Sequence, residues 1–199
     1  MSTHREAGYE NSETDTSDRI QSGGIHQKYQ DIVSGTVIPY QYSVLWDKAE
    51  GVEKSHVAQN FINAGRALRG EDAGDGFYGM VFQDSDAYKW LEAAAYSLAL
   101  RRDAALERQA DELISLIAAS QDEDGYLNTY FTIKDREKRW TNLLEGHELY
   151  CSGHLIEAAS RTLKPPESAY CLTPPSGMRS AFTTGSSRRG ARAFPDPRR

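Results

Sequence analysis

The pattern of apolar positions predicts helices along the middle of the chain. Apolar residues recur three and four positions apart in segments 37–51 and 55–68, which indicates two modest helices. Residues 70–80 are rich in glycine and predict a loop. The longest amphipathic run, 84–102, predicts the strongest helix, with Asp84 or Ser85 capping its first turn. We expect the buried face of that helix to consist of Tyr88, Leu91, Ala95, Leu98 and Ala99.

The segments that follow continue the helical pattern. After a short break at Asp103, residues 104–121 repeat the helical spacing, so the two helices are expected to form an antiparallel hairpin. Segment 121–131, "QDEDGYLNTYF", predicts a loop that opens onto an extended segment, and a further helix is expected from Asn142 to Leu163. No segment has the pattern of a central strand in a parallel sheet. The predicted fold class is therefore all-α, built from successive helical hairpins.

Composition divides the chain into three parts. Residues 1–27 are polar with hardly an aliphatic side chain, and we expect a disordered N-terminal arm. Residues 28–162 hold the predicted helices and form the expected domain. Residues 163–199 carry seven basic and two acidic side chains and six of the seven prolines, which predicts a disordered Pro/Arg-rich tail.

Charge and cysteine content exclude several classes of protein. The net charge of −6 disfavours a nucleic-acid partner. Because the tail is basic, the rest of the chain is still more acidic than this net charge indicates. No stretch approaches eighteen apolar residues and no apolar leader run is present, so we expect no membrane association. Two cysteines on either side of the composition break at 163 suggest no disulfide framework. We expect a cytoplasmic protein.

The densest group of reactive side chains lies in "EGHELYCSGH", residues 145–154. On a helix, His147, Cys151 and His154 would lie on the same face. Three interpretations of this arrangement compete. A zinc-peptidase motif needs a second histidine where Cys151 stands, and two ligands do not make a catalytic zinc site. Burial is the favoured interpretation for Cys151 and His154. In the third interpretation His147, near the helix start, faces a pocket at the open end of a helical barrel and offers a ring nitrogen to a polar ligand.

Four blocks in order resemble the N-terminal part of glycoside hydrolase family 127, the β-L-arabinofuranosidases. They are "VIPYQYSVLWD", "FYGMVFQDSDAYKWLEAAAYSLA", "LISLIAASQDEDGYLNTYF" and "RWTNLLEGHELYCSGHLIEAA", and they span Val37 to Ala159. The resemblance implies a truncated, incomplete (α/α)6 barrel from an enzyme that releases terminal arabinofuranose with retention of configuration. It also implies, for the full-length enzyme, zinc, a zinc-bound cysteine nucleophile and a glutamate acid/base. All of these residues lie downstream of the matching blocks in the family.

The resemblance therefore implies no catalytic residue, metal ligand or bound cofactor in this chain, and no activity of the fragment alone. The histidine of the "HELY" block lies in the family's sugar pocket, so His147 is the candidate contact for an arabinofuranoside. Further candidates from loops or helix starts that could line the same pocket are Gln83, Asp84, Asp86, Tyr126 and Asn128. Helix capping is the competing interpretation for the two aspartates. The alternative function is a small helical binding or scaffold protein with a basic tail.

The chain departs from the family pattern after Ala159. Paired prolines, Pro165 and Pro166, cannot continue the last helix. Codons for "KPPESAYC" preceded by G, read in the neighbouring frame, encode the family-like peptide "EATGKRLL", so we interpret residues 163–199 as frameshift-derived. A genuine disordered extension is the alternative. In either case an incomplete ring of hairpins exposes an apolar helix face, and we expect self-association through it.

Overall fold

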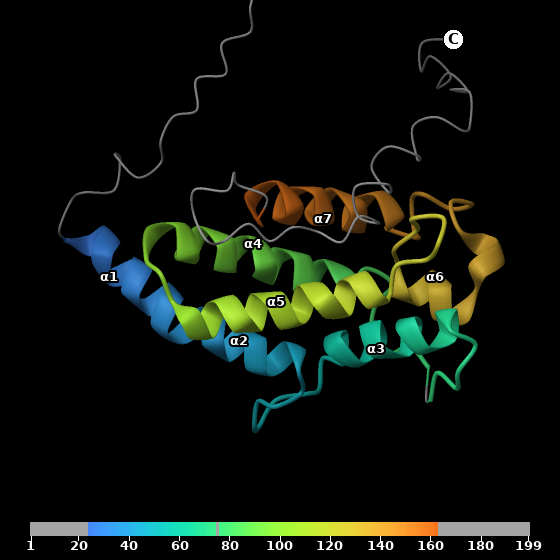
Figure 1. Ribbon diagram of the computed structural model, residues 1–199, viewed down its shortest axis with the longest axis horizontal. Helices are drawn as coiled ribbons and strands as arrows, with labels where there is room; N and C mark the ends of the chain where they lie inside the picture. The colour runs from blue at the N-terminus through green and yellow to red at the C-terminus, as the bar shows by residue number, and fades with distance from the viewer. Residues whose placement is uncertain (1–23, 75, 163–199) are drawn as a thin grey trace, which may run out of the picture.

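Helices and loops account for all of the chain that the structure, a computed structural model, describes, namely residues 24–74 and 76–162 (Figure 1). The elements in order are α1 (Ile25–Ile32), the π-helical turn η2 (Val33–Val37), α2 (Ile38–Leu45), α3 (Val57–Leu68), α4 (Asp84–Leu100), α5 (Ala104–Ala119), α6 (Thr129–Lys134), the 3-10 turn η3 (Arg136–Lys138) and α7 (Glu148–Thr162). The expected tail, with its frameshift interpretation, and most of the expected arm lie outside these ranges; residues 25–27 begin α1.

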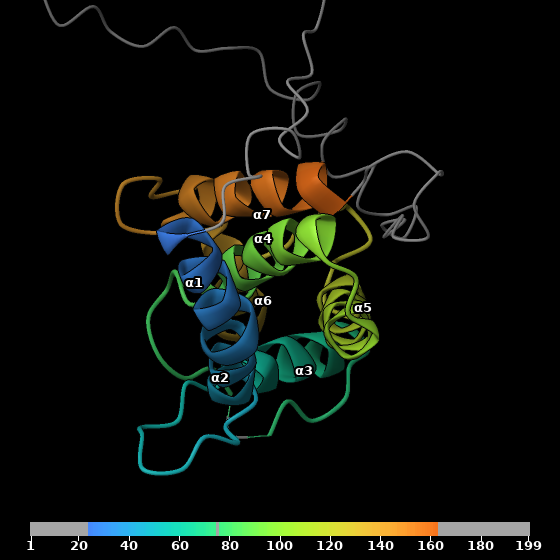
Figure 2. The same ribbon diagram turned by 90° about the vertical axis from the view of Figure 1, so that its left-hand side faces the viewer.

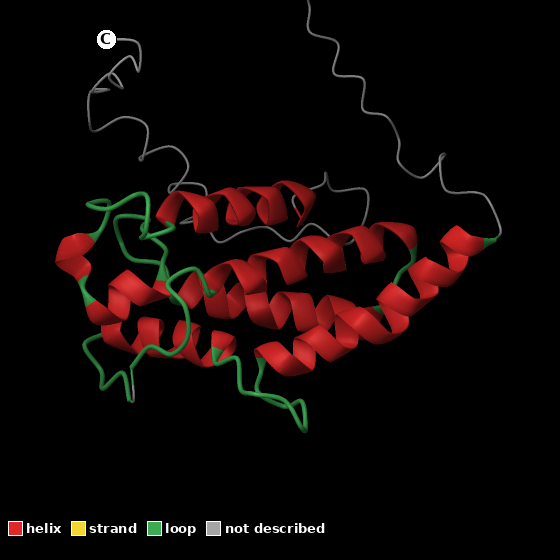
Figure 3. Cartoon of the chain, turned by 180° about the vertical axis from the view of Figure 1, so that it is seen from behind, coloured by secondary structure: helices red, strands yellow, loops and turns green. Residues whose placement is uncertain are grey.

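The helices are arranged as packed hairpins around α4 (Figure 2). α4 and α5 form the predicted antiparallel hairpin, and α2 crosses α4, where the Trp90 indole N–H donates to the Ile38 carbonyl at 2.9 Å. α7 packs along α4 in the same direction, since Phe82 contacts His147 near their beginnings and Tyr96 contacts Arg161 near their ends. Within the described ranges there is no strand (Figure 3), which confirms the all-α class.

The apolar core lies where α2, α3, α4, α5 and α7 meet. Its largest apolar side chains with at most 1% exposure are Tyr88, Phe61, Ile38, Leu113, Ile117 and Val57. On α4 the predicted face is correct for Tyr88 and Leu91 but wrong for Ala99, which is exposed. Ala87, Trp90 and Ala94 are buried instead. Because α2, α5 and α7 all pack on α4, its buried surface is wider than the single stripe that the spacing predicted.

The ends of the helices agree with the sequence where local capping sets them. Asp103 caps α5, since its carboxylate accepts hydrogen bonds from the backbone N–H groups of Ala105 and Leu106 at 2.8 and 3.1 Å. The prediction of an extended segment at the end of 121–131 is wrong, because Thr129 begins α6. Asn128 caps that helix, since its side chain accepts a hydrogen bond from the Phe131 N–H at 3.1 Å.

Large apolar side chains remain on the surface of α7 and of α1. Leu149 and Ile156, seven residues apart on α7, are 59% and 49% exposed. On α1, Ile25, Tyr29 and Ile32 are each more than half exposed. Self-association through such a face stays a prediction. Among the described residues no helix is both long and apolar enough to cross a membrane.

Candidate functional site

The beginnings of α4, α6 and α7 meet at one end of the bundle. Asp84, the first residue of α4, accepts hydrogen bonds from both the backbone N–H of Thr129, at 2.7 Å, and the Thr129 hydroxyl. Phe82, just before α4, packs its ring against that of His147, just before α7, with 5.1 Å between ring centroids. Chain segments more than sixty residues apart in the sequence therefore converge here, and most of the predicted site residues lie among them.

His147 sits at the N-cap of α7 rather than inside a helix. The prediction that the last helix begins at Asn142 is wrong: α7 begins at Glu148, and the Cys151 N–H donates to the His147 carbonyl at 2.9 Å. His147 has a left-handed φ of 52°, which ends any helix that approaches it from the N-terminal side. A left-handed histidine costs about 1 kcal/mol or more, so surrounding contacts must hold it there.

One ring nitrogen of His147 is engaged by the protein. Nδ1 lies 2.7 Å from the carbonyl oxygen of Glu145. A carbonyl oxygen only accepts hydrogen bonds, so Nδ1 carries the proton and, in the neutral ring, Nε2 is an acceptor. The ring is half-buried against Phe82 and Tyr150, which also contact each other, and these contacts limit its rotation. The arrangement presents an oriented hydrogen-bond acceptor, suited to a hydroxyl group.

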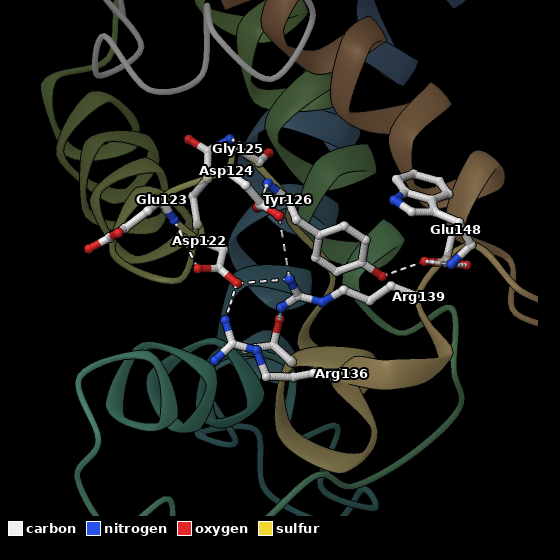
Figure 4. A network of polar contacts seen from close by, with 11 residues as sticks. Asp122, Glu123, Asp124, Gly125, Tyr126, Arg136, Arg139 and Glu148 are labelled. Carbon is white, nitrogen blue, oxygen red and sulfur yellow. Dashed lines mark hydrogen bonds and ion pairs between the residues drawn. The ribbon is translucent and has the colours of Figure 1, made fainter. Parts of the chain in front are cut away.

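Glu148, the next residue, is buried in a polar network (Figure 4). Its carboxylate accepts from the Tyr126 hydroxyl and from the Trp140 backbone N–H, the latter at 2.8 Å. Burial, together with the bond to Glu148, raises the pKa of Tyr126 well above its usual range, so the phenol stays a donor. Glu148 is thus committed inside the protein, and it does not have the water-directed role of the glutamate in a zinc-peptidase motif.

An arginine supports the network from the other side of Tyr126. The Arg139 guanidinium lies 3.9 Å from the centre of the Tyr126 ring and pairs with Asp122 at 2.8 Å (Figure 4). Arg136 pairs with the same carboxylate. Sequence reasoning missed Glu148, Arg139 and Asp122, because the bonds that join Glu148 to Trp140 and Tyr126, and Arg139 to Asp122, span eight or more residues and follow no local spacing.

Two of the predicted candidates brace the surroundings. The Gln83 side chain accepts from the Met80 N–H at 3.1 Å and donates to the Ser55 carbonyl at 3.2 Å, which ties the loop before α4 to the start of α3. Asp86 lies in the first turn of α4, half-exposed, with its carboxylate 3.7 Å from the Lys89 ammonium. Both side chains have protein partners at this end of the bundle.

The remaining candidates are buried. Asn128 caps α6 through its carbonyl oxygen, while its amide nitrogen is buried without a hydrogen-bond partner. Asp84 does not cap α4, contrary to the competing interpretation, but bonds to Thr129 across the bundle. Burial raises the pKa of the Asp84 carboxyl to about 6, an effect that the two Thr129 hydrogen bonds oppose. Tyr126 and Asp84 are therefore buried beneath the site and do not line its surface.

The burial expected of Cys151 and His154 is confirmed for Cys151 but only in part for His154, whose side chain is 24% exposed. Cys151 is buried, and burial, with a smaller effect from the Asp84 charge, raises the pKa of its thiol to about 12, so the thiol is neutral at physiological pH. The Nδ1 atom of His154 lies 3.2 Å from the Glu157 carboxylate. In residues 24–74 and 76–162 no three His, Cys, Asp or Glu side chains are placed to hold a metal ion, so these donors do not fit a zinc site. Cys171 lies outside those ranges.

Comparisons with known proteins agree on one family. Residues 20–166 match the model of the β-L-arabinofuranosidase GH127 catalytic domain. A non-reducing end β-L-arabinofuranosidase from Bifidobacterium longum subsp. longum is 40% identical over 150 residues, which are 67% of this chain and 22% of that protein.

Two solved structures are also similar. The crystal structure of a GH127 β-L-arabinofuranosidase from Geobacillus stearothermophilus T6 superposes with a TM-score of 0.67 at 48% identity, over 78% of this chain and 23% of that one. Another GH127 β-arabinofuranosidase gives a TM-score of 0.55 at 26% identity, over 73% and 22% of the two chains. The chain therefore spans less than a quarter of the length of these relatives, and the part that it matches is helical.

Proposed function

The chain belongs to glycoside hydrolase family 127, and we propose that it forms the N-terminal part of a β-L-arabinofuranosidase barrel that contacts the terminal arabinofuranose through His147. The proposal includes a cytoplasmic location, for which the low cysteine content is the support. The names of the relatives support arabinofuranose as the sugar. The geometry of one side chain, His147, supports the contact.

The observation that carries the proposal is the state of the His147 ring. Its Nδ1–H is already used by the Glu145 carbonyl at 2.7 Å, so the neutral ring has Nε2 as its remaining polar atom, and that atom can only accept. Sugar hydroxyls are donors that match such an acceptor. Phe82 and Tyr150 pack against the same ring and add apolar surface on which the carbon face of a furanose can lie.

We propose further that these 199 residues bind arabinofuranosides weakly and do not hydrolyse them. A retaining hydrolase needs a nucleophile and an acid/base. The described cysteine is a buried neutral thiol, and the two buried carboxylates at this end of the bundle are engaged: Glu148 by Tyr126, Asp84 by Thr129. For the whole enzyme the family resemblance implies zinc, which would hold and activate a cysteine thiolate. The residues described here supply no such donor set.

Binding of methyl β-L-arabinofuranoside, measured by NMR titration of the 199-residue protein, tests the proposal. We expect a Kd in the millimolar range, since one or two hydrogen bonds and a small contact area provide only about 4 kcal/mol. The His147→Ala variant should bind about three- to tenfold more weakly, the effect of one lost hydrogen bond. The matched control is His154→Ala, on the same helix and paired with Glu157, which should bind normally. Equal affinities for both variants would refute the role of His147.

A second arm tests the absence of turnover. An aryl β-L-arabinofuranoside should release no phenol above the rate in buffer, with or without added zinc. Hydrolysis by the purified chain would contradict the proposal that the catalytic groups are not among these residues.

A further inference from the structure

The loop that carries His147 is strained at both ends. Trp140 and His147 have left-handed φ angles of 61° and 52°, although neither is glycine. Each such residue costs roughly 1 kcal/mol or more, so a loop that adopts two of them needs specific contacts to hold it. The apolar side chains in the middle of the loop contribute little to holding it, because Leu143 and Leu144 are 46% and 86% exposed.

One buried carboxylate joins the two strained positions. Glu148 follows His147 directly in the chain, and its carboxylate accepts the backbone N–H of Trp140 with distances of 2.8 and 3.1 Å to its two oxygens. The carboxylate thereby closes the loop from 140 to 147 across its open side. Because Glu148 is 1% exposed, its carboxylate is satisfied by these protein donors rather than by bulk water, and the loss of one of them would leave a buried charge with fewer hydrogen bonds.

Tyr126 fixes the direction of that carboxylate. Its hydroxyl donates to Glu148 from the loop before α6, a segment with no other bond to the carboxylate (Figure 4). The Tyr126 ring is in turn packed between the Arg139 guanidinium, 3.9 Å from its centre, and the Trp140 ring, in an edge contact at 5.4 Å. Arg139 is held by its ion pair with Asp122. These contacts fix the orientation of the Tyr126 phenol, and its hydrogen bond in turn fixes the orientation of the Glu148 carboxylate.

We propose that Glu148 and Tyr126 form a positioning pair, which holds the 140–147 loop closed so that the His147 ring keeps its Nδ1–H on the Glu145 carbonyl and its Nε2 toward the ligand. The pair does not touch the sugar. It selects the tautomer and the direction of the residue that does, and to that extent the inference rests on the proposed function. The two polar residues of "HELY" thus have different roles: the histidine contacts the ligand and the glutamate holds the loop.

The chain offers a matched pair of substitutions. Tyr126→Phe removes the phenol that orients Glu148 and leaves the ring in place. Tyr42→Phe removes a similar bond elsewhere, since the Tyr42 hydroxyl donates to the Glu112 carboxylate at 2.5 Å between α2 and α5. Both variants lose one tyrosine–glutamate hydrogen bond, and Tyr126→Phe should lose more unfolding free energy, because Glu148 is buried whereas Glu112 is exposed. Only Tyr126→Phe is expected to change His147.

The readout is the tautomer of His147, seen in the long-range 1H–15N correlation spectrum of the full chain above pH 8 without sugar. The wild-type protein and Tyr42→Phe should show Nδ1 protonated and Nε2 unprotonated. In Tyr126→Phe the ratio of this tautomer to the other should fall about two- to tenfold, the factor that one lost hydrogen bond accounts for. An unchanged ratio in Tyr126→Phe, or an equal fall in Tyr42→Phe, would overturn the proposal.

Glu148→Gln is the second variant, and it serves if Tyr126→Phe does not fold. Its amide leaves one acceptor oxygen for two donors, so the same fall in the tautomer ratio is expected, and an unchanged ratio would again refute the positioning role. Because no sugar is present, the test is independent of ligand binding. A chain that shows the predicted tautomer changes but binds no arabinofuranoside would refute the proposed function and leave the positioning pair intact.

Discussion

The buried carboxyl of Asp84 makes the stability of this protein depend on pH in an uncommon direction. Asp84 is 2% exposed, and its pKa in the folded protein is about 6, against an ordinary value of 3.8. Between these values the folded chain keeps the proton on Asp84 and the unfolded chain has lost it. The free energy of unfolding must therefore fall as the pH rises from about 4 to about 6, and the loss is complete above 6.

The size of the effect follows from the two pKa values. A gap from 3.8 to about 6 corresponds to about 3 kcal/mol, since one pKa unit is worth about 1.4 kcal/mol. Asp84→Asn removes the titration and keeps the contacts, because an amide oxygen can accept from the Thr129 N–H while the amide N–H group donates to the Thr129 hydroxyl. Relative to the variant, the wild-type chain should lose about 3 kcal/mol between pH 4 and pH 7.

Urea unfolding at pH 4, 5, 6 and 7, followed by circular dichroism, measures this difference. Asp103→Asn is the control, because the N–H groups of Leu106 and Ala105 lower the pKa of this exposed cap and its effect has the opposite sign. The asparagine remains a good N-cap, so the difference between wild type and Asp103→Asn should be small, and it should change in favour of wild type as the pH rises. A constant difference between wild type and Asp84→Asn from pH 4 to pH 7 would refute the burial of an ionisable Asp84.

Further predictions concern the turn before α7 and the surface of that helix. Gly146→Ala would place a Cβ 2.6 Å from the Asn142 carbonyl oxygen and should lower the unfolding free energy by about 1–3 kcal/mol, measured in a thermal melt. Gly153→Ala, with nothing within 4 Å of the added Cβ, should raise it by about 0.5–1 kcal/mol. The reverse order of stability would contradict the packing. Cys151, in a Cys171→Ser background, should react with iodoacetamide at pH 8 only after denaturation, and rapid native labelling would show that the thiol is accessible. The double variant Leu149→Lys and Ile156→Lys should reduce light scattering of concentrated solutions, and unchanged scattering would place self-association on another surface.

The helices that were predicted well are those whose limits are encoded locally. The apolar spacing of α3, α4 and α5 gave their extents to within two residues, and Asp103 marked the start of α5 because its cap bonds reach only two and three residues along the chain. The blocks resembling family 127 then gave the barrel, which the comparisons confirm.

The parts that were missed depend on contacts between distant segments. "NLLEGHELY" has helical spacing, yet residues 142–147 form a turn, because Gly146 packs against Phe131 and Glu148 bonds to Tyr126 across 22 residues. Likewise Asp84 resembles a helix cap in the sequence, but its partner Thr129 is 45 residues away. Capping and periodicity describe neighbours in the chain, so neither could reveal these pairs. The sugar-facing role of His147 came from the family resemblance and stays a prediction.

The most direct test of that role is the 15N shift of the two His147 ring nitrogens during titration with methyl β-L-arabinofuranoside at a pH where the ring is neutral. If the sugar donates a hydroxyl to this residue, the Nε2 signal should move toward the position of a hydrogen-bonded acceptor in proportion to the bound fraction. The Nδ1 signal, held by the Glu145 carbonyl, should stay in place. Binding of the sugar with no shift at Nε2, or with movement at Nδ1 instead, would contradict the account.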